Sequence, residues 1–156
     1  MGGRVDGQTV GVMSTRGVVR RATPGDLEAL TELDVVVRAG RAKSPTLERR
    51  VESDEVLLCE LDDRVVGYAV VRARSFFDCD FVESLVVGTD DRRRGVGDLL
   101  LLNAVGHSAT RRIFTSTNQS NAAMINLLRK QGWHFSGRLE GVDEGDPELV
   151  YFIDVR

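Results

Sequence analysis

The stretch that decides the fold is Leu85-Val86-Val87-Gly88-Thr89-Asp90-Asp91-Arg92-Arg93-Arg94-Gly95-Val96-Gly97-Asp98-Leu99. An apolar strand runs into a polar turn, then into a loop rich in arginine and glycine, and then directly into a helix. The glycines allow the N–H groups of the loop to point toward one place, and they let a ligand approach the backbone closely. The helix that begins near Gly97 adds its free N–H groups and the positive end of its dipole. The stretch therefore predicts a binding site for a phosphate group.

Two common phosphate-binding motifs do not fit this loop. The segment Gly95-Val96-Gly97-Asp98-Leu99-Leu100 lacks the third glycine of a dinucleotide fingerprint. No Gly-Lys-Ser/Thr sequence follows it, so the loop is not that of a nucleoside-triphosphate P-loop. The pattern that remains is Arg-x-x-Gly-x-Gly after a strand that ends in Val-x-Thr.

This pattern resembles the signature of the GNAT superfamily of N-acetyltransferases, Arg/Gln-x-x-Gly-x-Gly/Ala between a strand and a helix. Arg92, Gly95 and Gly97 match it position for position. A second block, residues 121–133, is similar to the family pattern Asn-x-x-Ala-x-x-Leu-Tyr-x-x-x-Gly-Phe. The resemblance covers roughly residues 18–155, with both blocks in the order of the family.

The resemblance implies an α/β (α+β) fold: a GNAT-type mixed, mostly antiparallel, twisted sheet of about six to seven strands flanked by about four helices. It also implies acetyl-CoA as the acyl donor, with its pyrophosphate on the N–H groups of residues 93–98. The pantetheine arm would pair with residues 85–87 like an added strand. Asn121 would reach the pantetheine amides, Met124 would lie near the thiol, and the N–H near Val87 would polarise the thioester carbonyl. The residues thus assigned to the cofactor are Leu85, Val86, Val87, Arg92, Arg93, Arg94, Gly95, Val96, Gly97, Asp98, Asn121 and Met124.

Asp98 is an unusual residue for a pyrophosphate site. Its carboxylate suits the start of a helix, but it would repel the phosphates. We therefore expect this side chain to point outward or toward an arginine.

The implied reaction is direct transfer of an acetyl group to a primary amine, of a small molecule or of a protein, in a ternary complex. Glu83 precedes Leu85 and Val87 by two and four residues, so alternation along a strand predicts that all three share a face. A carboxylate there could act as the general base. The other interpretation is a solvated strand residue paired with Arg72 or Arg74.

The general acid is where the chain departs from the family. Leu128 stands where the family has Tyr, and it has no proton to donate. Tyr151, Ser120, Tyr68 and a bound water are the substitutes, although packing within strands also explains the two tyrosines. A non-catalytic acyl-CoA-binding or regulatory domain on the same fold, and transfer of an acyl group other than acetyl, stay open as alternatives.

The acceptor site has two contrasting borders. Residues 140–148 contain five acids and no base, which favours a cationic amine, although an exposed solvated turn explains them equally. Arg38, Arg41 and Lys43 lie between the first two expected helices and favour anions.

The length of 156 residues and the net charge of −3 predict one compact domain, residues 18–156, after a flexible arm, residues 1–17, in which Met13 is an alternative start. The composition disfavours a membrane span, general nucleic-acid binding and a secretory signal, so a cytoplasmic protein is expected. Cys59 and Cys79 are expected to be reduced, and His107 and His134 lack metal-ligand spacing, so no metal is expected. A homodimer is possible within the family.

Periodicity and turn residues predict the order of the elements. Thr23 caps a first helix with a core-facing stripe at Leu27, Leu30, Leu33 and Val37. Strands are expected at 18–22, 56–59, 65–73, 79–87, 113–116, 133–139 and 149–155. Further helices are expected from Ser44-Pro45 through Val51, at 97–109 with a core face of Leu99, Leu102, Val105 and Ala109, and at 121–131 before Gly132.

Overall fold

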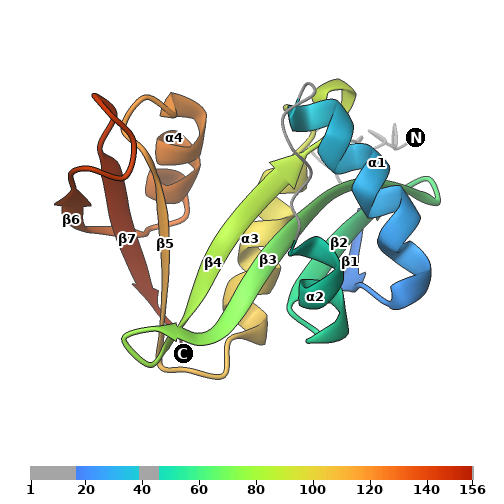
Figure 1. The fold of residues 1–156 in the computed structure, drawn as a ribbon, viewed down its shortest axis with the longest axis horizontal. Helices are drawn as coiled ribbons and strands as arrows, with labels where there is room; N and C mark the ends of the chain where they lie inside the picture. The colour runs from blue at the N-terminus through green and yellow to red at the C-terminus, as the bar shows by residue number, and fades with distance from the viewer. Residues whose placement is uncertain (1–16, 39–45, 156) are drawn as a thin grey trace, which may run out of the picture.

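Seven strands form one sheet in the computed structural model, which describes residues 17–38 and 46–155. Their spatial order is β1-β2-β3-β4-β5-β7-β6, and every pair of neighbours is antiparallel except β4 and β5. With four α-helices in the described ranges, this confirms the mixed, mostly antiparallel fold (Figure 1). The strands are β1 Val18–Arg21, β2 Val56–Leu61, β3 Arg64–Phe76, β4 Cys79–Val87, β5 Arg112–Asn118, β6 His134–Leu139 and β7 Glu148–Asp154. The helices are α1 Leu27–Arg38, α2 Leu47–Glu52, α3 Val96–His107 and α4 Ala122–Lys130, with short 3-10 turns at Pro24–Asp26 and Thr89–Asp91.

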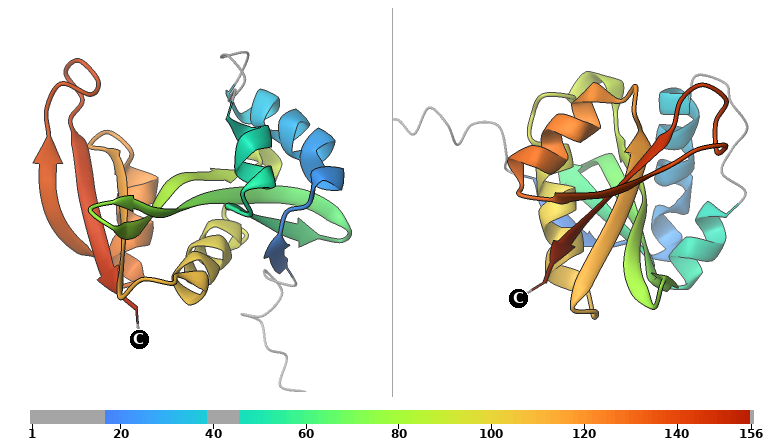
Figure 2. Two further views of the ribbon diagram at one scale, coloured as in Figure 1. Left: turned by 60° about the horizontal axis from the view of Figure 1, so that its bottom comes forward. Right: turned by 90° about the vertical axis from the view of Figure 1, so that its left-hand side faces the viewer.

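The helices cover both faces of the sheet. Helices α1 and α2 lie on one face, and α3 and α4 lie on the other (Figure 2). Two buried clusters match these layers: one includes Leu100, Ile113 and Leu128 beneath α3 and α4, and the other includes Leu30 and Tyr68 beneath α1. Each fully buried large apolar side chain contributes about 1.5–3 kcal/mol, so the two clusters hold both layers on the sheet.

Strands β4 and β5 separate partway along their length. Their parallel pairing joins Asp80, Phe81 and Val82 to Ile113, Phe114 and Thr115, and it goes no further. Figure 1 shows the two strands diverging beyond this point, and the β5-facing edge of residues 83–87 has no strand partner in the described part of the chain. The sheet is thereby split into a β1–β4 half and a β5–β7 half.

The face that α3 buries agrees only in part with the predicted one, because Leu99 and Val105 are partly buried against the core. The buried residues of α3 are Val96, Leu100, Leu101 and Ala104, whereas Leu102 is 57% exposed. Residues 99–102 are four consecutive leucines, so their periodicity does not fix which side of the helix faces the sheet. Ala109 lies beyond the last helical residue, His107.

Thr23 is the N-cap of the turn that leads into the first helix, as predicted. The N–H of Thr23 donates to Asp26 Oδ2 at 2.8 Å, which closes a capping box on the short turn before α1. Arg20 donates two hydrogen bonds to the same carboxylate, and they hold the pKa of Asp26 well below its usual range. Of the predicted stripe, Leu30 is fully buried.

Some expectations fall on residues outside the described ranges. These include nearly all of the arm at residues 1–17, as well as Arg41, Lys43 and Ser44-Pro45. Both cysteines are free, and burial raises the pKa of the Cys59 thiol. No helix in residues 17–38 and 46–155 is both long and apolar enough to cross a membrane.

Candidate active site

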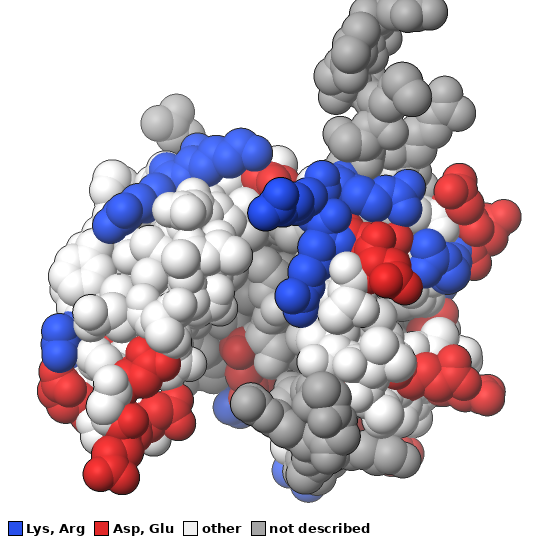
Figure 3. All heavy atoms as spheres, turned by 90° about the horizontal axis from the view of Figure 1, so that it is seen from above, with Lys and Arg blue, Asp and Glu red and all other residues white. Residues whose placement is uncertain are grey.

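A cleft of about 470 Å³ opens where β4 and β5 diverge. It is lined by the end of β4, by the loop that follows, and by the first turns of α3 and α4. Figure 3 looks onto this end of the molecule and shows a hollow between the two halves, with Lys and Arg side chains gathered along its rim. The structure brings together here eleven of the twelve residues that the sequence assigned to the cofactor: Leu85, Val86, Val87, Arg92, Arg93, Gly95, Val96, Gly97, Asp98, Asn121 and Met124.

The loop takes its shape from left-handed backbone conformations. Gly95 is the N-cap of α3 with φ 79° and ψ 10°, and Arg93 has φ 60°. The first hydrogen bond of the helix joins Leu99 N to Gly95 O at 3.0 Å. The N–H groups of residues 96–98 therefore have no acceptor within the helix. They face the cleft together with the positive end of the helix dipole. This arrangement can bind a phosphate.

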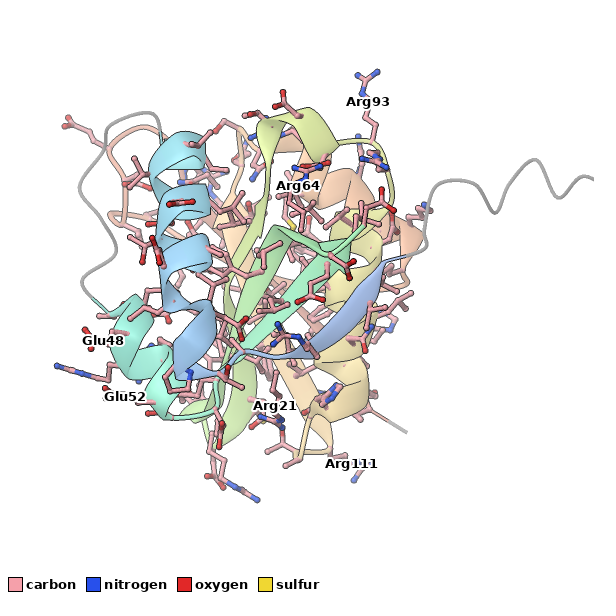
Figure 4. All side chains as sticks on the ribbon, turned by 90° about the vertical axis from the view of Figure 1, so that its right-hand side faces the viewer. Arg21, Glu48, Glu52, Arg64, Arg93 and Arg111 are labelled. Carbon is pink, nitrogen blue, oxygen red and sulfur yellow. The ribbon has the colours of Figure 1, made fainter. Side chains whose placement is uncertain are left out.

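The three arginines of the loop have different roles. Arg92 and Arg93 line the cleft, and Arg93 extends away from the body of the molecule beyond the start of α3 (Figure 4). Arg94 is the one assigned residue that does not line the cleft. Its Nη1 donates to Asp91 Oδ1 at 3.0 Å, and Arg64 also donates to Asp91, at 3.1 and 3.2 Å.

Asp91 is a site residue that neither sequence motif predicts. It is 3% exposed, it lines the cleft, and its carboxylate joins β3 to the loop through Arg64 and Arg94. A signal was present, because Asp91 and Arg94 are three residues apart, a spacing that pairs opposite charges within a turn. Val37, Ala123 and Leu127 also line the cleft and carried no such signal.

The side chain of Asp98 is partly exposed, and its partner is a lysine and not the expected arginine. Its Oδ1 lies 3.3 Å from Lys130 Nζ, and its backbone carbonyl accepts a hydrogen bond from Gln131 Nε2 at 2.9 Å. Both partners stand at the C-terminal end of α4, so they tie the start of α3 to the other half of the sheet. The lysine offsets the negative charge that would otherwise face a phosphate.

The prediction that Glu83 shares a face with Leu85 and Val87 is wrong. Val70 pairs with Ser84 and Val71 pairs with Val82, so Glu83 lies in a β-bulge that interrupts the alternation of side chains. Leu85 and Val87 pack against the core beneath α3. Glu83 Oε2 instead lies 3.3 Å from Arg50 Nε of α2, on the opposite face of the sheet.

Arg50 thus takes the place of the predicted partners Arg72 and Arg74. It also lies 3.5 Å from Glu55. The side chain of Glu83 is more exposed than those of Arg50 and Glu55, so its carboxylate is accessible from the face covered by α1 and α2.

None of the candidate acids lines the cleft. Tyr151 is 3% exposed and packs in the core beneath α4, edge to face with Phe135. The Tyr68 hydroxyl donates to Asp34 Oδ1 at 2.7 Å under α1. The Ser120 hydroxyl donates to Asp146 Oδ2 at 2.5 Å. Leu128, at the family's Tyr position, is fully buried.

The acidic segment 140–148 is partly engaged by its neighbours. Asp143 accepts from Asn118, Asp146 accepts from Ser120, and Glu148 accepts from Ser116. These contacts tie the segment to β5 and to the residues that follow it. In the described part of the chain, no group of three or more His, Cys, Asp and Glu side chains is placed to hold a metal ion.

Taken together, the cleft fits a ligand that carries a phosphate group and an extended arm lying along an open strand edge. The family model described as acetyltransferase (GNAT) family matches residues 27–133. The chain therefore belongs to the GNAT acetyltransferase family, in which acetyl-CoA is the acetyl donor. The comparison of the sequence with curated proteins gave no match.

Solved structures agree with this assignment. A GNAT-family acetyltransferase from Bacillus cereus is 29% identical, with a TM-score of 0.86 over 91% of this chain and 99% of that one. The yncA protein of Salmonella typhimurium, whose structure contains its cofactor acetyl-CoA, is 23% identical, with a TM-score of 0.71 over 91% and 95% of the two chains. The ribosomal-protein-alanine N-acetyltransferase of Brucella melitensis is 23% identical, with a TM-score of 0.66 over 88% and 99%.

Proposed function

We propose that the protein transfers the acetyl group of acetyl-CoA directly to a primary amine in a ternary complex. The observation that carries the proposal is a cleft in which the N–H groups at the start of α3 meet the open edge of β4. In this proposal the pyrophosphate binds residues 93–98, with Arg92 and Arg93 beside it, and the pantetheine arm lies along residues 85–87. Asn121 and Met124 border the same cleft at the start of α4.

In the proposed reaction the lone pair of the amine nitrogen attacks the thioester carbonyl carbon. The N–H of Val87 stabilises the negative charge that develops on the oxygen. The C–S bond then breaks, the amide forms, the nitrogen loses a proton, and the thiolate of CoA gains one. The products are the N-acetylated amine and CoA.

Glu83 is the proposed acceptor of the proton from the nitrogen, directly or through water. It lies in the bulge that immediately follows the last β4–β5 pair, two residues before Leu85, the first residue of β4 that lines the cleft. No protein side chain is assigned as the general acid, so the thiolate is proposed to take its proton from solvent.

A pH–rate profile tests the role of Glu83. We expect the Glu83→Gln enzyme to lose the rising limb of its kcat/KM profile, because the amide cannot accept a proton. Glu55→Gln is the matched control, since Glu55 also contacts Arg50 but does not lie on β4, and its Oε2 accepts a hydrogen bond from Ala73 N of β3 at 3.1 Å. A profile that Glu83→Gln leaves unchanged would remove Glu83 from the base role.

The alternative function is a non-catalytic acyl-CoA-binding domain, and the observation that favours it is the buried Leu128 at the Tyr position. Thermal shifts with acetyl-CoA, longer acyl-CoAs and CoA measure binding to the cleft. Thiol release against a panel of amines measures transfer. Stabilisation by acetyl-CoA without thiol release from any amine would favour the alternative.

A further inference from the structure

Five phenylalanines gather on the sheet face opposite α3 and α4. Val82, Ile113 and Tyr151 point into the core beneath those helices, so their strand neighbours Phe81, Phe114 and Phe152 point the other way. Phe81 pairs with Phe114 and Phe114 pairs with Phe152, so the three rings form a row across β4, β5 and β7. Together with Phe76 and Phe77 of the β3–β4 hairpin, we call these residues the phenylalanine cluster.

The rings of the cluster contact one another across strands. The Phe76 ring centroid lies 5.1 Å from that of Phe81 and 5.0 Å from that of Phe114. Phe114 lies 5.7 Å from Phe152, and Phe77 lies edge to face with Phe76 at 5.0 Å. Phe77 is 86% exposed at the hairpin. Figure 1 shows that α1 and α2 cover this face only over β2–β4 and leave β5, β7 and the hairpin uncovered.

A groove of about 360 Å³ lies over the cluster. Phe76 and Phe77 form one wall, residues 136–139 of β6 form the other, and Phe114 and Val150 line it between them. Arg138 is the one charged residue of its lining within the described ranges. Its guanidinium is engaged by Glu140 and by Gln119.

On the same face of the sheet, carboxylates follow the phenyl rings in the direction of the cofactor cleft. Along β4, Glu83 follows Phe81 by two residues and faces the same side of the sheet as α2. Along β5, Ser116 follows Phe114 by two residues, and its hydroxyl donates to Glu148 Oε1 at 2.7 Å. Two residues of a strand span about 6.6 Å, which is the length of a short alkyl arm. One face therefore presents carboxylates on the cleft side of the phenyl rings and an apolar groove one short arm away.

We propose that the acetyl acceptor is a primary amine joined by a short arm to an apolar ring; this rests on the proposed function of the cleft. The ring lies in the groove against Phe76 and Phe114, and the amine lies at the mouth of the cleft between Glu83 and Glu148. A second ammonium group, as in a diamine, would be buried in the groove without a partner, and the groove disfavours it. The groove residues thus determine specificity without taking part in the transfer of the acetyl group.

The test compares 2-phenylethylamine with putrescine and ethanolamine in the thiol-release assay. We expect kcat/KM to be at least about tenfold higher for 2-phenylethylamine, the range that added apolar contact supplies in a pocket. Phe76→Ser and Phe77→Ser should raise KM for 2-phenylethylamine with kcat nearly unchanged, because the ring is held equally in the ground state and the transition state. Phe77→Ser removes a side chain exposed to solvent, so it remains informative even if Phe76→Ser folds poorly.

Phe135→Ser is the matched control. Phe135 is another partly exposed phenylalanine of the sheet, 58% exposed, but it faces Tyr151 on the opposite side. An equal loss of selectivity in this variant, or a wild-type enzyme without preference for the ring, would overturn the proposal. The proposal would also be overturned if Phe77→Ser converted a dimer into a monomer and left the selectivity unchanged. The phenylalanine cluster would then bind a second copy of the chain and not the substrate.

A binding measurement separates this proposal from the proposed function. Ligand-observed fluorine NMR of 4-fluorophenethylamine in the presence of CoA reports occupancy of the groove without acetyl transfer. If no amine releases thiol, the transferase proposal fails. Binding that Phe77→Ser weakens and Phe135→Ser preserves would still support the ligand class, and absence of binding would refute it.

Discussion

Gly95 and Gly97 occupy the same loop but should respond oppositely to alanine. Gly95 has φ 79°, a left-handed conformation that costs a residue with a side chain about 1–2 kcal/mol. The reduced freedom of the unfolded chain returns about 0.4–1 kcal/mol of this, so we expect Gly95→Ala to lose about 1 kcal/mol of stability. A methyl group on Gly97 would lie 3.4 Å from Leu127 Cδ2, an ordinary contact. At this helical position alanine gains about 0.5–1 kcal/mol over glycine, so Gly97→Ala should be neutral or stabilising.

Thermal unfolding and acetyl-CoA binding measure the two effects separately. For a chain of this size 1 kcal/mol corresponds to about 2–4 °C, so Tm should fall by that amount for Gly95→Ala and should not fall for Gly97→Ala. The affinity for acetyl-CoA should fall for Gly95→Ala, because the N–H groups of the loop move with the backbone. It should stay within about threefold for Gly97→Ala, a difference of less than 1 kcal/mol. Equal destabilisation by the two substitutions would refute the assignment of the left-handed conformation to Gly95.

Two further predictions concern the framework around the cleft. Asp26→Asn should lower the free energy of unfolding by about 1–2 kcal/mol at pH 7, because it removes the ion pair with Arg20, which is partly exposed. Because Arg20 holds the pKa of Asp26 below its usual value, the ion pair stabilises the protein above about pH 4, and this stabilisation declines as the pH falls further. Urea unfolding of the wild-type and Asp26→Asn proteins at pH 7 and pH 3 measures the effect. A difference in unfolding free energy that does not change with pH would contradict the ion pair. Leu128→Tyr restores the family residue but overfills a buried position, so it should lower stability by about 1–3 kcal/mol without raising kcat. Unfolding followed through the single tryptophan, Trp133, together with thiol release, checks this, and a more active and equally stable enzyme would contradict it.

Much of the cofactor side of the cleft is predictable from the sequence because it is local. A strand, a turn, a glycine loop and a helix within 15 residues determine where their own N–H groups point. The loop at Gly95 stands where it was predicted, and α4 begins one residue after the predicted start at Asn121, whose Oδ1 caps the helix by accepting from Met124 N at 3.2 Å. These features depend on neighbours in the chain, which the residue types specify.

The parts that could not be predicted depend on contacts between distant elements. A bulge in the pairing of β4 with β3 determines the face of the sheet on which Glu83 lies. One extra residue in a strand moves every following side chain to the opposite face. The partner of Asp98 is a lysine 32 residues away, across the split in the sheet. The orientation of α3 is likewise decided by packing against the sheet, because consecutive leucines offer it more than one apolar side.

The two motif glycines are therefore under different physical constraints. Three parallel pairs join the halves of the sheet, and contacts of Asp98 with Lys130 and Gln131 join α3 to the end of α4. The ion pair of Asp98 with Lys130 is largely exposed and contributes less than about 1 kcal/mol. Leu127, which packs against the core, lies close to α3 at Gly97, so that position has room for a small side chain such as the methyl group of alanine. Gly95 provides the conformation that turns the loop toward a phosphate, whereas Gly97 provides the close approach that keeps the second wall of the cleft in place.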